Sequence, residues 1–350
     1  MFKQVFLTLL VGCGATLPAC SRQAPPATSA SQGAQHEVVV YTALDRQFSE
    51  PILDEFTART GIKASAVYDT ESTKTVGLAN RIRAEAGRPR CDVFWNNEIL
   101  NTLRLKQEGL LQKCDPGQAV NYAPQWRDPD GTWYGFAARA RIIIIDTELV
   151  KPEDMPTSVR DLADPHWRGR AGMAKPLFGT TASHVAALFA VLGEQTAKEL
   201  LLSFKRNDIQ VTAGNKACAE MVGAGRLALA LTDTDDAMEE IDAGHPVKIV
   251  FPDSGADQMG TLVLPNTLAL VKGCPHPEAG ERLIDFLLSA DVEARLGTGP
   301  SAQIPLNRET KARSRVGELV QMHVMPVDFA VAADAFPAAA KYIEREFLTP

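Results

Sequence analysis

The chain has 350 residues, of which 23% are charged and 45% are hydrophobic, and its formal net charge is −7. This mildly acidic balance excludes the class of proteins that bind nucleic acid non-specifically through a basic surface. Beyond the N-terminal segment the sequence contains no uninterrupted apolar run of about 20 residues, which excludes a membrane-spanning helix in that part of the chain. About 310 residues remain after that segment, enough for two domains of ordinary size.

The N-terminal segment has the order of a bacterial lipoprotein signal peptide. Lys3 provides the positive charge, residues 5–11 form a short apolar stretch, and residues 17–20 read Leu-Pro-Ala-Cys. In such a sequence the small residue before the cysteine fits the signal peptidase, and the cysteine thiol receives the lipid. We therefore predict a signal peptide over residues 1–19 and a lipidated Cys20, with an ordinary secretory signal as the alternative.

The segment that follows is expected to be a tether. Residues 20–36 are rich in Ser, Ala, Gln and Pro and show no hydrophobic periodicity, a composition typical of a flexible linker. With a lipid on Cys20, this order predicts a periplasmic protein that is anchored to a membrane by its N-terminus.

Four of the six cysteines lie beyond residue 20, namely Cys91, Cys114, Cys218 and Cys274. They are widely spaced and include no C-x-x-C pair, so a zinc site is not expected. Outside the cytoplasm one or two disulfides could form. Sequence proximity favours a Cys91–Cys114 pair, and four buried free thiols are the alternative that the sequence leaves open.

Strand and helix patterns alternate along the first half of the globular part. Residues 36–42 form a compact β-branched run typical of a buried parallel strand, and Gly61 ends the helix that follows. Such alternation is typical of an α/β sheet. The predicted order is strand 36–42, a helix up to Gly61, strand 62–68, a helix with Leu78 and Ile82 on one face, and strand 92–95.

The same alternation resumes in the second half. Residues 141–146 contain four consecutive isoleucines, which indicate a strongly buried strand. Pro277 suits the first turn of a helix. The predicted order is strand 141–146, a helix after Gly179, strand 209–212, helix 215–223, strands 227–232, 247–251 and 261–271, a helix from Pro277, and a mostly helical stretch from Arg308.

The loops that follow the predicted strands are short and polar. Because α/β sheets bind ligands at the carboxyl ends of their strands, these loops predict a polar cleft. Each loop taken alone is also compatible with caps and turns that satisfy their own backbone. The loops are Thr42, residues 69–72, residues 96–98, residues 180–184 and residues 232–236.

Short stretches spread over residues 37–310 carry a family resemblance. They are Val40-Tyr-Thr-Ala43, Thr60-Gly-Ile62, Asp92-Val-Phe-Trp95, Arg139-Ala-Arg141, Asp164-Pro-His-Trp-Arg-Gly169, Pro265-Asn-Thr267 and Pro275-His-Pro277. In this order they are similar to the ferric-ion-binding periplasmic proteins of ABC importers.

The resemblance implies an α/β fold, the periplasmic binding protein fold of the second type. In this fold two lobes are joined by hinge strands and close on a ligand. The implied division is lobe 1 over residues 37–140 and 262–310, lobe 2 over residues 141–261, a C-terminal helical segment over residues 311–350 packed on the lobes, and crossings near residues 139–142 and 260–265.

One departure from the family concerns its metal ligands. Ferric-binding members hold iron with tyrosinate oxygens, including an adjacent Tyr-Tyr pair after a strand of the second lobe. The corresponding stretch, residues 231–236, reads Leu-Thr-Asp-Thr-Asp-Asp, and Tyr41 lies inside a predicted strand where packing is expected. The carboxylates of Asp235 and Asp236, predicted at a strand end, are hard donors and candidate metal ligands, although one could instead cap a helix from Ala237.

The polar loops also suit an oxyanion such as phosphate, a phosphonate or a sugar phosphate. Residues 179–183 at a helix start offer backbone N–H groups and hydroxyls at the positive end of the helix dipole. Arg141, near the expected hinge, could pair bidentately with the anion. The predicted ligand-binding residues are Thr42, Ser72, Asn96, Arg141, Thr180, Thr181, Ser183 and Asp235.

A competing interpretation assigns the acidic residues Asp233, Asp235, Asp236 and Glu98 to an amine or to sugar hydroxyls. Trp95 could then stack on a ring, although a tryptophan within a strand is typical of a core. His184 is expected to be a packed helix residue.

The function implied by these features is that of an extracellular solute-binding lipoprotein of an ABC importer. We expect a monomer that captures a small molecule or ion, Fe(III) or an oxyanion, and delivers it to a permease of the inner membrane, without a cofactor. A lipoprotein that senses a solute for a membrane receptor is the alternative. An enzyme is not expected, because the sequence contains no G-x-S-x-G, H-E-x-x-H or P-loop pattern.

Overall fold

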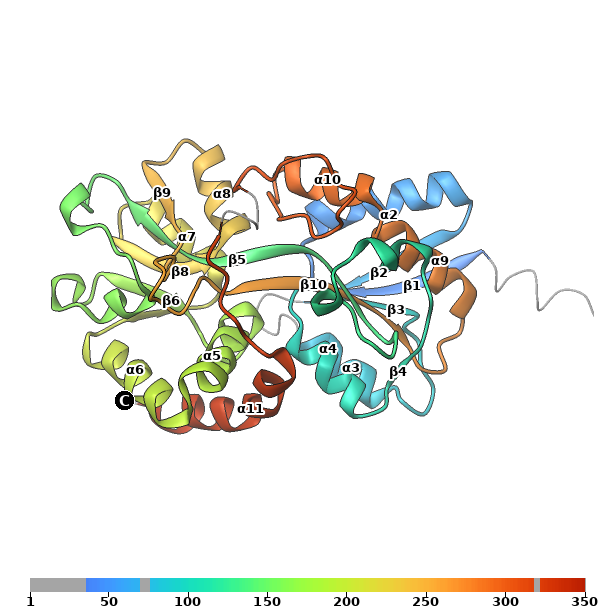
Figure 1. The fold of residues 1–350 in the computed structure, drawn as a ribbon, viewed down its shortest axis with the longest axis horizontal. Coiled ribbons are helices and arrows are strands. Elements are labelled where there is room, and N and C mark those ends of the chain that lie inside the picture. Colours follow the sequence, from blue (N-terminus) through green and yellow to red (C-terminus); the bar gives the residue numbers. More distant parts are fainter. Residues whose placement is uncertain (1–35, 70–75, 318–321, 350) are drawn as a thin grey trace, which may run out of the picture.

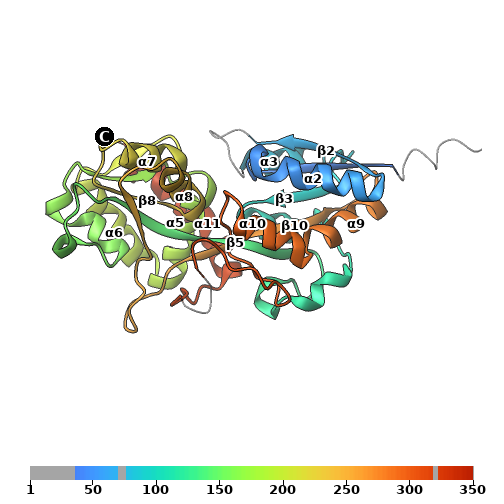
Figure 2. The same ribbon diagram turned by 90° about the horizontal axis from the view of Figure 1, so that it is seen from above.

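Two long strands cross the middle of the molecule and join two α/β lobes, as Figures 1 and 2 show. These strands are β5 (Tyr134–Asp146) and β10 (Val263–Val271). The structure is a computed structural model that describes residues 36–69, 76–317 and 322–349. The predicted fold class, a two-lobed periplasmic binding protein of the second type, is confirmed by this architecture and by the solved structures compared below.

The first lobe is built on the strands that the β-branched runs predict. β1 (Glu37–Thr42) lies between β2 (Lys63–Tyr68) and β3 (Val93–Asn96) and is parallel to both. β10 pairs antiparallel with β3 and also with the short β4 (Leu111–Gln112). Helices cover this sheet, and Val38, Val40 and Val93 are fully buried, as the run of β-branched residues predicts.

The strand β5 changes partner at the centre of the molecule. Its first part, from Tyr134 to Ala140, pairs with β10, and from Arg141 onward it pairs with β8 (Leu229–Asp233). On its other edge it pairs with β9 (Val247–Val250). The four isoleucines 142–145 are fully buried because each face of the strand packs in a hydrophobic cluster, one with Ile142 and Ile144 and the other with Ile143 and Ile145.

The second lobe continues the sheet with β8, β6 (Ala171–Ala174) and β7 (Gln210–Thr212), which run parallel to one another. Three helices begin beside the carboxyl ends of these strands: α5 (Gly179–Leu192), α7 (Asn215–Gly223) and α8 (Thr234–Asp242). Their N-termini therefore meet at one edge of the sheet, next to the point where β5 changes partner.

The C-terminal helix spans both lobes. α11 (Phe329–Tyr342) packs against α5 of the second lobe and α4 (Leu100–Gln107) of the first, as Figure 1 shows. The ring of Tyr342 packs on Phe189, and Arg104 lies over the ring of Phe336. The predicted, mostly helical stretch from Arg308 is helical only from Phe329 to Phe347, and the described residues 308–317 and 322–328 form turns and irregular backbone.

The sequence-based order lacks β4, β6, α4, α6 (Glu194–Arg206) and α10 (Ala290–Thr298), because these segments are short or have no clear start signal. The predicted strand 141–146 begins earlier, at Tyr134. The remaining helices are α2 (Arg46–Thr60), α3 (Val76–Ala84), α6 (Glu194–Arg206), α9 (Pro277–Leu287) and α10 (Ala290–Thr298), with short helices at Gly117–Asn121, Pro124–Trp126, Pro152–Asp154, Val159–Ala163, Pro165–Trp167 and Ile343–Phe347.

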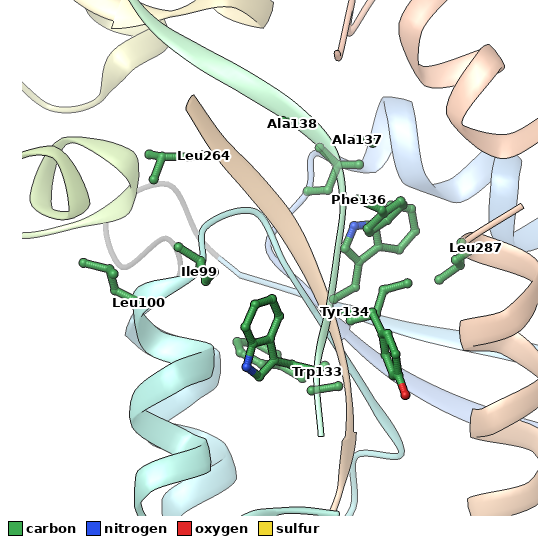
Figure 3. Close-up of a cluster of buried hydrophobic side chains, with 14 of the residues drawn as sticks. Ile99, Leu100, Trp133, Tyr134, Phe136, Ala137, Ala138, Leu264 and Leu287 are labelled. Atoms are coloured by element: carbon green, nitrogen blue, oxygen red, sulfur yellow. The ribbon is translucent and has the colours of Figure 1, made fainter. Parts of the chain in front are cut away.

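A buried hydrophobic cluster surrounds the crossing strands. Figure 3 shows Phe136 and Ala137 on β5, Leu264 on β10 and Ile99 beside α4 as parts of it. Asn266 donates from its side chain to the carbonyl oxygen of Ala137, whose φ of 41° marks a left-handed kink in β5. Within the described residues, the helices are too short or too polar to cross a membrane.

Candidate ligand pocket at the lobe junction

A narrow polar pocket lies where β5 passes from one lobe to the other. About 30 Å³ of it is open to the centre of a water-sized sphere, which is room for a small ion or for one or two waters. It is lined by Asn97, Arg139, Ala174, Lys175, Phe178, Gly179, Thr180, Ala213, Gly214, Asn215, Asp233, Asp235 and Asp236.

A fully buried arginine organises one wall of the pocket. The Nη1 atom of Arg141 donates to Asp233 at 2.8 Å and to Thr180 and Asn215 at 3.1 Å each, and its Nη2 donates to Thr181 at 3.1 Å. Asp233 also accepts from the Thr180 hydroxyl at 2.5 Å and from Asn215 at 3.0 Å. The guanidinium and carboxylate therefore fix the first turn of α5 and of α7 relative to β8.

Arg139, two residues earlier on β5, faces the same pocket with unused donors. Its Nη1 lies 2.9 Å from Asp235, whereas its buried Nε and Nη2 have no hydrogen-bond partner in the described part of the chain. Burial acts to lower the pKa of this guanidinium, but Asp235 and Asp233 outweigh burial and raise it, so Arg139 stays a cation. Nε and Nη2 form the edge of a guanidinium that pairs bidentately with oxyanions.

Three helix N-termini converge on the pocket. Residues at the starts of α5, α7 and α8 line the pocket. In each of these three helices the N-cap residue makes no side-chain hydrogen bond to the N–H groups of the first turn. In α5 the first intrahelical bond is donated by Ala182, so the N–H groups of Gly179, Thr180 and Thr181 point out of the helix start. Each N-terminus carries a partial positive charge of about +0.5.

The side-chain charges around the pocket nearly cancel. Arg139, Arg141 and Lys175 give three positive charges, and Asp233, Asp235 and Asp236 give three negative ones. The partial charges of the three helix N-termini then make the local potential positive.

The predicted ligand residues separate into two groups. Thr180 and Asp235 line the pocket, and Arg141 and Thr181 lie behind the lining and form hydrogen bonds with its residues. Thr42, Asn96 and Ser183 are buried outside its lining: Thr42 accepts from the Leu44 N–H, and Asn96 and Ser183 both donate to Glu98. Ser72 and Cys20 lie outside the described residues.

The aspartates after β8 occupy a helix and not a strand end. Asp235 and Asp236 lie in the first turn of α8, which begins at Thr234, so the predicted helix start at Ala237 is three residues too late. Negative residues in a first helical turn are stabilised by the helix dipole, which explains the position of this pair.

The five tyrosines of the chain contact residues outside the pocket lining. Tyr41, Tyr122, Tyr134 and Tyr342 each donate their hydroxyl to a carboxylate or carbonyl oxygen, and Tyr68 is stacked under Arg46. Burial raises the pKa of each of these five phenols, which disfavours a phenolate. No tyrosine lines the pocket among the residues that the structure describes.

A cluster of three carboxylates could be considered for a metal ion. Oxygens of Asp233, Asp235 and Asp236 lie within 4.8 Å of one another. However, Arg141 binds Asp233 and Arg139 binds Asp235. Two guanidinium groups against the same carboxylates would repel a trivalent cation, so this donor set does not fit Fe(III).

Other candidates of the competing interpretation are packed in the interior. Trp95 packs against Phe136, with ring centroids 5.6 Å apart. Glu98 is fully buried and accepts backbone hydrogen bonds from Leu100 and Asn101. Burial and then Arg141 lower the pKa of His184 to about 3, so this side chain is neutral.

The four cysteines beyond residue 20 are buried free thiols, and the Cys91–Cys114 disulfide is not formed.

Four polar side chains of the pocket were absent from every sequence-based ligand assignment: Arg139, Lys175, Asn215 and Asn97. Arg139 lies two positions before Arg141, and residues i and i+2 of a strand share a face, so this spacing was the available signal. Asn215 is the first residue of a predicted helix that follows a strand, and Thr180 was predicted as a ligand because it lies at the start of another such helix. Asn97 lies in the predicted polar loop 96–98, of which only Asn96 was predicted to bind the ligand.

Solved structures of similar shape show the same fold. Iron-bound HitA from Pseudomonas aeruginosa superposes with a TM-score of 0.79 at 22% identity, over 88% of this chain and 99% of that one. The periplasmic binding protein AfuA from Actinobacillus pleuropneumoniae, with fructose-6-phosphate bound, gives 0.79 at 20% identity, over 90% and 99%. The fold is that of a two-lobed periplasmic binding protein.

The chain belongs to the family of bacterial extracellular solute-binding proteins, whose family model matches residues 101–331. A similar relative is Iron uptake protein A1 of Synechocystis sp., with 28% identity over 88% of each chain. The putative 2-aminoethylphosphonate-binding periplasmic protein of Salmonella typhi is 22% identical over 77% of this chain and 78% of its own length. The predicted family resemblance is thereby confirmed.

Proposed function

We propose that the protein is a lipid-anchored solute-binding protein of an ABC importer and that its solute carries an oxyanion group. The group would bind at the junction of the lobes, between the first turn of α5 and the guanidinium of Arg139. Phosphate, a phosphonate or a phosphate ester has the required chemistry.

The observation that carries this proposal is the convergence of three uncapped helix N-termini on a buried arginine with unused donors. Backbone N–H groups at a helix start and the dipole of the helix both favour an anion. The Nε and Nη2 of Arg139 are already desolvated, so pairing them with an oxyanion restores hydrogen bonds that burial has removed.

The relatives named above differ in what they bind. Their names and titles include iron, 2-aminoethylphosphonate and fructose-6-phosphate. The second and third of these solutes carry an oxyanion, in agreement with the pocket. Tyrosinate binding of Fe(III) is disfavoured here, because residues 231–236, where the resemblance places the family's tyrosine pair, contain no tyrosine, and two arginines neutralise the nearby carboxylates.

Isothermal titration calorimetry of the purified protein tests the oxyanion. Inorganic phosphate, 2-aminoethylphosphonate, fructose-6-phosphate and ferric citrate are compared, and we expect saturable binding of at least one phosphorus oxyanion. Arg139→Gln should weaken it about 10- to 100-fold, because a charge-assisted hydrogen bond contributes about 1.5–3 kcal/mol. Arg168→Gln, in an exposed ion pair with Asp208, is the control and should bind as the wild type does.

Binding of ferric citrate alone, with a visible charge-transfer band, would refute the oxyanion assignment.

The anchor is tested separately. Cys20→Ala should release the protein from the membrane fraction, because the thiol that receives the lipid is lost. Metabolic labelling with a palmitate analogue should mark the wild type and not the variant. Membrane retention of Cys20→Ala would contradict lipidation, and that result would leave the pocket chemistry untouched.

The proposed partner is an ABC permease of the inner membrane, which receives the solute from a monomeric binding protein. Size-exclusion chromatography with light scattering should give the mass of one chain. Uptake of a bound oxyanion that requires both this protein and a permease would support import. A receptor-dependent response without uptake would favour the sensing alternative.

A further inference from the structure

A buried carboxylate–hydroxyl contact joins the two lobes close to the pocket. Ser183 in α5 donates its hydroxyl to Oε2 of Glu98, in the loop before α4, at 2.8 Å, and both side chains are buried. We infer that Glu98 is a positioning residue that docks α5 on the first lobe and so determines how long a bound solute stays. The inference rests on the proposed function, because it concerns closure of the same pocket.

Glu98 is fixed within the first lobe by hydrogen bonds that are independent of Ser183. Its Oε1 accepts from Asn96 Nδ2 at 2.7 Å and from the Asn101 N–H at 3.0 Å, and its Oε2 accepts from the Leu100 N–H at 2.6 Å. The two backbone donors belong to the first turn of α4, where the helix dipole favours a negative charge. The carboxylate is therefore held ready at the surface of the first lobe that α5 meets.

Ser183 belongs to the same rigid element as the pocket wall. It lies one turn after Thr180, whose hydroxyl donates to Asp233 in the pocket. On the opposite side of the contact, Asn97 lines the pocket and is flanked by Asn96 and Glu98, which bond to each other. The Glu98–Ser183 contact therefore ties the α5 wall of the pocket to the segment that carries Asn97.

Of the other side-chain contacts between the lobes, the buried Arg139–Asp235 ion pair belongs to the pocket itself, whereas the contacts of Gln47 and Arg315 are exposed. Gln47 in α2 donates to Glu239 in α8 at 2.7 Å, and Arg315 pairs with Asp242. Water and salt compete with such contacts, so they contribute little to closure. The Glu98–Ser183 hydrogen bond is shielded from water, so its loss should weaken mainly the conformation in which the lobes touch.

The test compares Ser183→Ala with Ser203→Ala, a matched change on α6 whose hydroxyl bonds only within its own helix. In the ligand-free full chain, Ser183→Ala should increase the radius of gyration measured by X-ray scattering and the hydrogen exchange of the α4 first turn. With phosphate and 2-aminoethylphosphonate as probes, stopped-flow fluorescence should show dissociation about tenfold faster and little change in association. Ser183→Thr keeps the hydroxyl and should restore the wild-type rates.

A second variant links the effect to Glu98. Glu98→Gln should also speed dissociation, and adding Ser183→Ala to it should have a smaller effect than in the wild type, because the two side chains act on one contact. Scattering, exchange and dissociation equal to those of Ser203→Ala would overturn the inference. If the wild type binds neither probe, the oxyanion proposal fails, while scattering and exchange of the ligand-free chain still decide the role of Glu98.

Discussion

Replacing Arg141 with methionine should destabilise the protein strongly. Its guanidinium is fully buried and donates four hydrogen bonds, one of them to Asp233 at 2.8 Å. Arg141→Met keeps much of the apolar stem but leaves a buried carboxylate without its cation. Breaking a buried ion pair in this way costs about 3–5 kcal/mol. At about 2 °C per kcal/mol for a chain of this size, the expected fall in Tm is about 6–10 °C.

Arg168→Met is the matched control. Arg168 also pairs with an aspartate, Asp208, at 2.7 Å, but both side chains are more than half exposed. An exposed pair contributes about 0–1 kcal/mol, so its Tm should change by no more than about 2 °C. Thermal unfolding followed by circular dichroism measures both variants. Equal losses for Arg141→Met and Arg168→Met would show that the Arg141–Asp233 pair does not hold the pocket wall together.

A double variant tests whether the unpaired carboxylate of Asp233 causes the loss of stability in Arg141→Met. Adding Asp233→Leu to Arg141→Met removes the stranded carboxylate, and part of the lost stability should return. The recovery should be incomplete, because Thr180 and Asn215 also donate to Asp233 and would lose their acceptor. A double variant less stable than Arg141→Met would contradict this account of the loss.

The remaining predictions concern pH and backbone conformation. The folded pKa of His184, about 3, lies below the usual 6.5, so the unfolded chain takes up a proton first and stability is lost as pH falls below 6.5. Between pH 7 and pH 5 the free energy of unfolding, measured with urea, should therefore fall by about 2 kcal/mol more for the wild type than for His184→Phe. Equal decreases for the two proteins would refute this role of His184. Gly260 has φ +86°, and a Cβ there would lie 2.5 Å from the Met325 nitrogen. Gly260→Ala should cost at least about 2 kcal/mol in the same assay, whereas Gly87→Ala, with open space around it, should change little.

The pocket also explains why acidic residues surround a proposed anion site. Asp233 and Asp235 bind Arg141 and Arg139, so these carboxylates orient the guanidinium groups and limit the net charge that must be buried. The remaining attraction for an anion then comes from backbone dipoles, which are neutral overall and cost less to bury than further cations.

The order of strands and helices could be read from the sequence because it depends on local patterns. The β-branched run at residues 37–42 and the isoleucines 142–145 are buried strands, and Gly61 ends α2 in a left-handed conformation. The absence of tyrosine from residues 231–236 was equally visible, because it depends only on which residues occupy the stretch. Short helices such as α4 carry too few apolar turns for their period to stand out.

Only the tertiary structure decided which polar residues form the pocket. Arg139, Asn215 and Asp233 are far apart in sequence and meet because β5 changes partner between the lobes and three helices begin at the same sheet edge. Ser183 and Thr180 looked alike as hydroxyls at a helix start, yet one faces Glu98 and the other faces Asp233. Their directions depend on how α5 packs against its neighbours, and packing between distant segments is not encoded in any local pattern.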